Sequence, residues 1–162
     1  MDRLLERLAF WCRTAPHSIA VEDAAELITH AELGRRSDRL AAALRCAGIG
    51  PEDVVGVLLP RGALLVTSLI AIWKCGATYL PLDPAHPRHK LRQLADGAGA
   101  RLIVGRGNRH VSDSAIHLDA TAEGPLPLPQ APYFARAAAY VHGTSGTTGA
   151  PRGVVVEQHH VQ

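Results

Sequence analysis

A stretch near the C-terminal end of the sequence carries residue types that could bind a polyphosphate. Between Gly143 and Gly153 there are four glycines, three threonines, one serine and one arginine. Glycine lets the backbone approach a ligand closely, and successive N–H groups in such a turn form an anion-binding concavity. Hydroxyls add short donors, and Arg152 could add a fixed charge with forked donors. The stretch therefore predicts a loop that closes over the phosphates of a nucleotide.

The plainer interpretation is a surface turn between two buried strands, since Gly, Ser and Thr are common in turns. The flanks support strands on both sides, with a small apolar run at 137–141 and three valines at 154–156. The Walker pattern and the Gly-x-Gly-x-x-Gly pattern are both absent, which argues against a P-loop NTPase and a Rossmann dehydrogenase.

The elements that must position this loop follow an alternating pattern. Apolar residues that recur with a period of 3.6 predict helices over 2–14, 30–47, 62–75 and 87–97. For the second helix, Thr29 is expected to cap the start, with Glu32 completing a capping box, and Gly48 is expected to end it. Short apolar runs predict strands over 19–22, 26–28, 54–59, 78–80, 101–104, 115–118, 137–141 and 154–157, with a tight turn at 23–25. The alternation predicts an α/β fold with a mainly parallel sheet flanked by helices. Residues 119–132, rich in proline, are expected to form a linker-like connection.

The length and composition are those of one ordinary globular domain. The 162 residues are 47% apolar, with a net charge of +2 and interspersed signs, which argues against a nucleic-acid partner. The apolar window 54–73 is interrupted at Pro60, and each part is too short to cross about 30 Å of hydrocarbon. No secretion signal is visible at the N-terminus. We expect a cytoplasmic protein without a membrane partner.

Several single residues have structural interpretations. Cys12, Cys46 and Cys75 are widely spaced and are expected to be buried free thiols in a reducing cytosol. His159 and His160 are adjacent and are expected to lie in a polar turn, so we predict no metal site. Asp83 is expected to form a turn. The arginines are expected to form the solvated face of a helix; they are Arg35, Arg36, Arg39 and Arg45.

Three motifs resemble the adenylate-forming enzymes, which include acyl-CoA synthetases, luciferases and the adenylation domains of nonribosomal peptide synthetases. Residues 144–154, TSGTTGAPRGV, are similar to the phosphate-loop signature of that family. Residues 28–33, ITHAEL, and 73–84, WKCGATYLPLDP, resemble the first two core motifs of peptide-synthetase adenylation domains. The motifs occur in the family's order across about residues 18–160. The string at 81–87 favours the amino-acid-activating branch over the acyl-CoA synthetase and luciferase branches.

The resemblance implies that residues 1–162 are the N-terminal portion of an adenylation domain, an incomplete part of its large subdomain. It implies activation of an amino acid or other carboxylate by ATP with Mg²⁺, and transfer of the acyl group to the phosphopantetheine thiol of a carrier protein. The residues implied to bind the β- and γ-phosphates are Thr144, Ser145, Gly146, Thr147, Thr148, Gly149, Arg152 and Gly153. No catalytic acid or base is identifiable, because this role is positioning and electrostatic stabilisation.

The motifs depart from the family pattern in a few positions, and other functions stay open. His30 stands where tyrosine is usual, Gly143 where an aromatic is common, and Ala150 and Arg152 where lysines are usual. In the family, the carboxylate pocket, the adenine and ribose contacts and a mobile lysine follow the loop. We therefore expect the chain to be inactive alone or to work with a complementary downstream polypeptide. The alternatives are a non-catalytic interaction module and an independent phosphate-binding protein.

Overall fold

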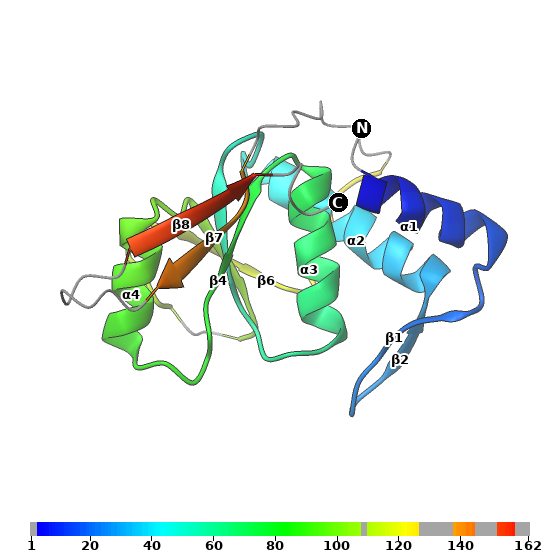
Figure 1. Cartoon of the computed structure of the whole chain (residues 1–162), viewed down its shortest axis with the longest axis horizontal. Coiled ribbons are helices and arrows are strands. Elements are labelled where there is room, and N and C mark those ends of the chain that lie inside the picture. Colours follow the sequence, from blue (N-terminus) through cyan, green and yellow to red (C-terminus); the bar gives the residue numbers. More distant parts are fainter. Residues whose placement is uncertain (1–2, 108–109, 127–137, 145–151, 158–162) are drawn as a thin grey trace.

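Six strands form one sheet in the computed structural model, which describes residues 3–107, 110–126, 138–144 and 152–157. The strand order is β6-β5-β3-β4-β7-β8, and every neighbouring pair is parallel except β7 with β8 (Figure 1). The strands are β3 (Val54–Leu58), β4 (Thr78–Pro81), β5 (Leu102–Gly105), β6 (Ile116–Asp119), β7 (Ala138–Thr144) and β8 (Arg152–Glu157). The predicted mainly parallel sheet is confirmed.

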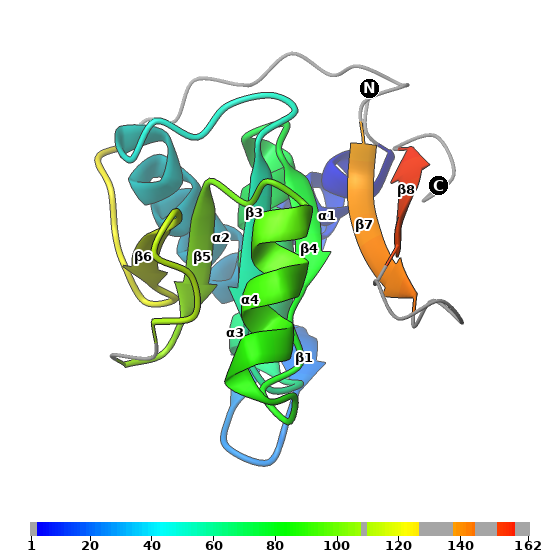
Figure 2. The ribbon, with the colours of Figure 1, turned by 90° about the vertical axis from the view of Figure 1, so that its left-hand side faces the viewer.

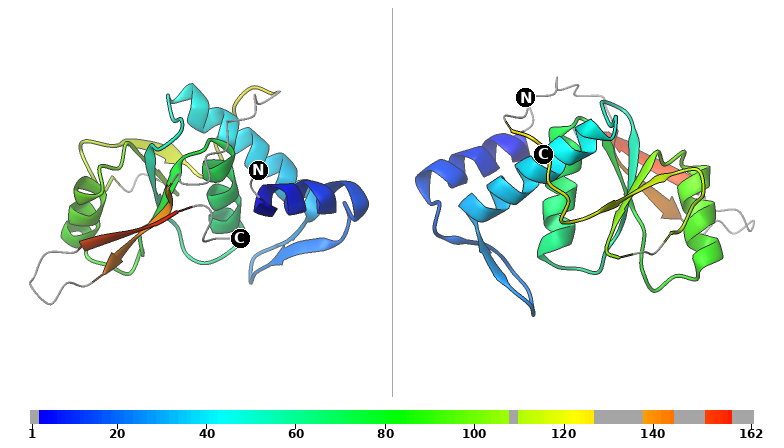
Figure 3. Two further views of the ribbon diagram at one scale, coloured as in Figure 1. Left: turned by 45° about the horizontal axis from the view of Figure 1, so that its top comes forward. Right: turned by 180° about the vertical axis from the view of Figure 1, so that it is seen from behind.

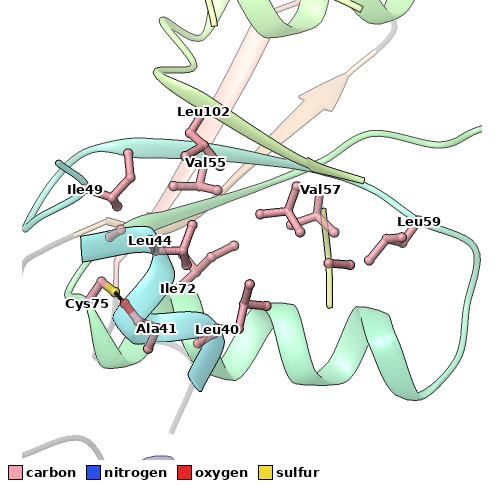
Figure 4. Close-up of a cluster of buried hydrophobic side chains, with 14 residues drawn as sticks. Leu40, Ala41, Leu44, Ile49, Val55, Val57, Leu59, Ile72, Cys75 and Leu102 are labelled. Carbon is pink, nitrogen blue, oxygen red and sulfur yellow. Dashed lines mark hydrogen bonds between the residues drawn. The ribbon is translucent and has the colours of Figure 1, made fainter. Parts of the chain in front are cut away.

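Helices cover both faces of this sheet. Two lie on one face, α2 (His30–Cys46) and α3 (Ala63–Lys74), and α4 (Arg88–Gly97) lies on the other (Figure 2). Because β3 is covered on both sides, its residues alternate between two cores. Val55 and Val57 pack with Leu44 and Ile72 of the two helices (Figure 4), whereas Leu58 packs with Leu91 of α4. This explains the continuous apolar run of β3.

The N-terminal residues form a smaller layer beside α2 and α3. It contains α1 (Arg3–Thr14) and the antiparallel hairpin of β1 (Ile19–Glu22) and β2 (Leu27–Thr29), which extends away from the main sheet (Figure 3). Ile28 and Leu33 are buried there with Ile70 of α3. Since α3 contributes to this cluster as well as to the main core, it joins the layer to the sheet.

The turn of this hairpin caps α3. Gly62 precedes the helix and has no side chain to offer, so the backbone N–H of Ala63 donates to Oδ2 of Asp23 (2.7 Å). Oδ1 of Asp23 accepts from the N–H groups of Ala25 and Glu26. These three hydrogen bonds lower the pKa of Asp23, and the bond from Ala63 contributes most. The sequence predicted a turn at Asp23 but not its contact with a helix 40 residues later.

The cap at the start of α2 is confirmed in part. Oγ1 of Thr29 accepts from the N–H of Glu32 (3.3 Å), and Gly48 follows the helix with a φ of 84°, where glycine is favoured. The carboxylate of Glu32 instead accepts from Arg35 and Arg36, which replaces the reciprocal half of the predicted capping box.

The prediction that all three thiols are buried is wrong for Cys46. Cys75 is buried and Cys12 is partly buried, where its Sγ lies 3.1 Å from the carbonyl oxygen of His30. Cys46 is exposed because it is the last residue of α2 and lies beside the buried stripe rather than within it. All three thiols are free.

The chain after β6 returns to α2. The N–H of Gly124 donates to the carbonyl of Arg39 (2.9 Å), and the side chains of Arg39 and Glu123 form an ion pair. A Cβ added at Gly124 would lie 2.3 Å from the backbone nitrogen of Ala43. The first residues of the predicted connection are therefore fitted closely to the helix backbone.

We expect Gly124→Ala to lower the free energy of unfolding by about 1–3 kcal/mol, because the added methyl must push this segment away from α2. Urea unfolding at pH 7 measures the change. Gly97→Ala is the matched control, since nothing lies within 4 Å of its added Cβ and alanine is the better helix former. Equal stabilities of Gly124→Ala and the unmodified chain would contradict the close fit.

Candidate functional site

The predicted phosphate loop connects two paired strands. Thr144 of β7 faces Arg152 of β8, and Gly143 faces Gly153. These four residues were predicted to belong to the loop, but their backbones continue the ladder. Ser145, Gly146, Thr147, Thr148 and Gly149 lie outside the described residues. The structure therefore brings the two ends of the predicted loop together as a β-hairpin.

This hairpin connection follows the carboxyl end of a parallel strand. The chain leaves β3, β4 and β7 at the same edge of the sheet, because these strands run parallel. In open α/β sheets, ligands bind outside the carboxyl ends of the strands. The end of β7 is thus a position where a bound ligand would be expected.

The N-terminus of α3, at the same edge, is already occupied by a carboxylate of the chain itself. The N-terminus of α3 follows β3 and would attract an anion, but its first N–H donates to the carboxylate of Asp23. Sequence reasoning missed this contact, and the only signal for it was the Asp in a tight turn. Among the described residues, the end of the β7–β8 hairpin is the better candidate for a phosphate group.

The motif at 73–84 supports the strand beside β7. Nζ of Lys74 donates to Asp38 Oδ1 and Ser37 Oγ of α2, both at 2.8 Å. Gly76 has a φ of 73° and reverses the chain between α3 and β4. After β4, Oδ1 of Asp83 accepts from the N–H of Ala85 (2.9 Å). The predicted turn role of Asp83 is confirmed, and Lys74 serves helix packing.

The motif at 28–33 joins α2 to the N-terminal layer. Nε of Arg36 donates to Glu32 at 2.6 Å, and its Nη1 donates to Glu26 of the adjacent turn. Nδ1 of His30 lies 3.1 Å from the carbonyl oxygen of Ser18, and its ring stacks on Trp11. These residues hold α1, α2 and the β1–β2 hairpin together. They lie away from β7 and β8, the strands that flank the predicted loop.

Three of the four arginines of α2 bind carboxylates. Arg35 and Arg36 pair with Glu32, and Arg39 pairs with Glu123. Hydrogen bonds from Arg35 and Arg36 lower the pKa of Glu32 from 4.5 to about 2. The fourth, Arg45, was also expected on the solvated face, but it is partly buried, and its Nη2 donates to the carbonyl of Lys74 (3.3 Å).

This pKa predicts an acid-dependent loss of stability. Since the pKa of Glu32 is lower in the folded chain, its contribution is complete above about pH 5 and disappears as the pH falls towards 2. We expect about 1 kcal/mol or less, because the pair is partly exposed and screened by solvent. Unfolding followed in urea between pH 7 and pH 2.5 should show a smaller decline for Glu32→Gln than for the unmodified chain. Parallel curves would contradict the assignment.

Other types of site have no candidate within the described ranges. No group of three or more His, Cys, Asp or Glu side chains there could hold a metal ion. We therefore assign no Mg²⁺ ligands in that part of the chain. None of the helices in the described part combines the length and apolar character needed to cross a bilayer. His159 and His160 lie outside the described residues.

Comparisons with known proteins agree with the motifs. The family model for AMP-binding enzymes matches residues 8–161. CymA of Salinispora arenicola, a probable nonribosomal peptide synthetase, is 40% identical over 141 residues, 87% of this chain and 2% of CymA. The AMB antimetabolite synthetase AmbB of Pseudomonas aeruginosa is 36% identical over 152 residues, 90% of this chain and 12% of AmbB. The chain thus spans a small part of the curated relatives it matches.

A solved structure extends the agreement to three dimensions. The nonribosomal peptide synthetase FmoA3, in a form with AMPPNP bound, superposes with a TM-score of 0.87 at 30% sequence identity. The superposition covers 98% of this chain and 17% of FmoA3.

Proposed function

Because the chain belongs to the family of AMP-binding enzymes, we propose that it supplies the ATP phosphate-binding loop of an adenylation domain. Its similarity to nonribosomal peptide synthetases supports an adenylation domain that activates an amino acid. The AMPPNP named for the FmoA3 structure supports ATP as the nucleotide.

The observation that carries this proposal is the register of the β7–β8 hairpin. With Thr144 opposite Arg152, the seven residues from Ser145 to Pro151 connect two paired strand ends at the carboxyl edge of the sheet. Three hydroxyl side chains and two glycines fall within that connection. A short connection with these donors is suited to surround a phosphate group.

The loop would act on the leaving group. A carboxylate oxygen of the substrate attacks the α-phosphorus of ATP, and the bond from that phosphorus to the bridging oxygen of the β-phosphate breaks. The products are an acyl-adenylate and pyrophosphate. The hydroxyls of Thr144, Ser145, Thr147 and Thr148 and the N–H groups of Gly146 and Gly149 would donate to the departing pyrophosphate. Arg152 would add positive charge. Stabilising this developing charge lowers the barrier, and no proton needs to be removed by the protein.

The substrate and the acceptor follow from the family branch. The string at 81–87 favours an amino acid as the carboxylate, and the acyl group would pass to the phosphopantetheine thiol of a carrier protein. An acyl-CoA synthetase would use the same first step with another carboxylate. Magnesium would accompany ATP, and the reaction would take place in the cytoplasm.

Calorimetric titration of the 162-residue chain with ATP tests the proposal. We expect saturable one-to-one binding that pyrophosphate competes with and adenosine does not. Absence of binding, or competition by adenosine alone, would count against a phosphate-binding loop. We expect no ATP–pyrophosphate exchange by these residues alone with any amino acid, and exchange above background would refute that expectation.

A further inference from the structure

The strand that leads into the predicted loop has little backbone contact with its parallel neighbour. β3 and β4 have four facing residue pairs, as do β3 and β5. β4 and β7 have one, Tyr79 with Tyr140. Backbone pairing alone therefore defines the position of β7 along β4 less firmly than it defines the central strands.

Two side chains bind β7 at its start. Nε1 of Trp73, near the end of α3, donates to the carbonyl of Ala139 (3.1 Å). Oγ1 of Thr78, the first residue of β4, donates to the carbonyl of Ala138 (3.1 Å). These two donors reach consecutive carbonyls of one strand from two different elements.

Both donors are themselves held in place. Thr78 is 1% exposed, and its N–H donates to the carbonyl of Asp53 (2.8 Å). Trp73 is partly buried, and a buried indole N–H requires an acceptor. A shift of β7 would take from both donors the carbonyls that they now bind, and the buried hydroxyl of Thr78 could not turn to water instead.

The positions of these bonds matter for the loop. A shift of β7 by one residue would carry Thr144 about 3.3 Å along the sheet and turn Val141 away from the core that it shares with Leu80. A shift by two residues would keep the same face of β7 towards the core, so the alternation of inward and outward side chains does not by itself exclude it. Arg152 would move with Thr144, because the two face each other across β7 and β8.

We infer that Trp73 and Thr78 are positioning residues, which set the register of β7 on β4 and thereby place Thr144 and Arg152 at the phosphate site. The inference about the site rests on the proposed function. Neither side chain is proposed to touch ATP. Displacement of a binding group by about 1 Å can reduce a rate about 100-fold, so this register would affect ATP binding and turnover without contact.

Amide hydrogen exchange of the full chain tests the register directly. In Thr78→Val, which keeps the side-chain shape and removes the donor, we expect amides of β7 and β8 to exchange about tenfold faster. Amides of β3 and β5 should be unchanged, and Thr78→Ser should restore protection. Trp73→Phe should have the same local effect. The inference would be overturned if β7 and β8 exchanged at the same rate in these variants as in the unmodified chain, or if exchange increased uniformly through the sheet.

The matched control is Thr67→Val. Thr67 is 2% exposed, and its Oγ1 donates to the carbonyl of Ala63 within α3, so this variant also removes a buried threonine hydroxyl bonded to the backbone. We expect β7 and β8 to keep their protection in it. Selective loss of β7 protection in Thr67→Val would contradict the role assigned to Thr78.

ATP titration of the same variants separates this inference from the proposed function. We expect Thr78→Val to raise the Kd for ATP about tenfold and Thr78→Ser to restore it, an effect that a general loss of stability would not produce. If the unmodified chain binds no ATP while exchange changes as expected, the register is confirmed and the proposed function is refuted. If ATP binds and Thr78→Val changes neither exchange nor Kd, the inference is refuted alone.

Discussion

Replacing Thr147 and Thr148 together by alanine is expected to weaken ATP binding by about 100-fold or more. Each charge-assisted hydrogen bond from a hydroxyl to a phosphate contributes about 1.5–3 kcal/mol, and two are removed. The expectation rests on the residue types and on the hairpin that joins Thr144 to Arg152. Calorimetric titration of the variant and the unmodified chain at the same ionic strength measures the ratio of the two Kd values.

Thr14→Ala is the control for this double variant. Thr14 is exposed at the end of α1, and its Oγ1 donates to the carbonyl of Phe10. The control removes a threonine hydroxyl far along the chain from the loop, and we expect its Kd to match that of the unmodified chain. Equal Kd values for the double variant and the control would show that these hydroxyls do not bind the phosphates.

Replacing Leu44 by alanine is expected to lower the free energy of unfolding by about 2–5 kcal/mol. Leu44 is 0% exposed and packs against Val55 of β3 and its neighbours in the core between α2 and the sheet (Figure 4). Alanine keeps the helix, so the loss comes from the removed contacts and the cavity. Urea unfolding monitored by circular dichroism measures it.

The control for the core is Leu27→Ala. Leu27 lies in β2 and is 58% exposed, so the same chemical change removes little buried surface. We expect a loss below about 1 kcal/mol. Similar losses at Leu44 and Leu27 would contradict the placement of the main core between α2, α3 and the sheet.

The elements that could be predicted are those with local causes. The apolar run at 54–59 requires a strand covered on both faces, and β3 has helices on both sides. Thr29 caps α2 through a bond three residues away, and Gly48 takes the left-handed conformation that ends it. The motif at 144–154 identified the family, which the family model confirms.

The elements that could not be predicted depend on residues far apart in the chain. Asp23 caps α3 from 40 residues away, and Trp73 binds a carbonyl 66 residues later. Neither contact leaves a periodic pattern in the sequence. The strands β7 and β8 extend through Thr144 and from Arg152 because they pair with each other, whereas glycine and threonine content alone suggested loop.

The most direct test of the central claim is the response of the loop's own glycine amides to phosphate ligands. In ¹⁵N–¹H spectra of the chain, we expect the signals of Gly146 and Gly149 to shift on addition of ATP and, in the same direction, on addition of pyrophosphate. Adenosine should leave them unchanged. If ATP binds and shifts other amides while these two stay in place, residues 145–151 are not the phosphate-binding loop.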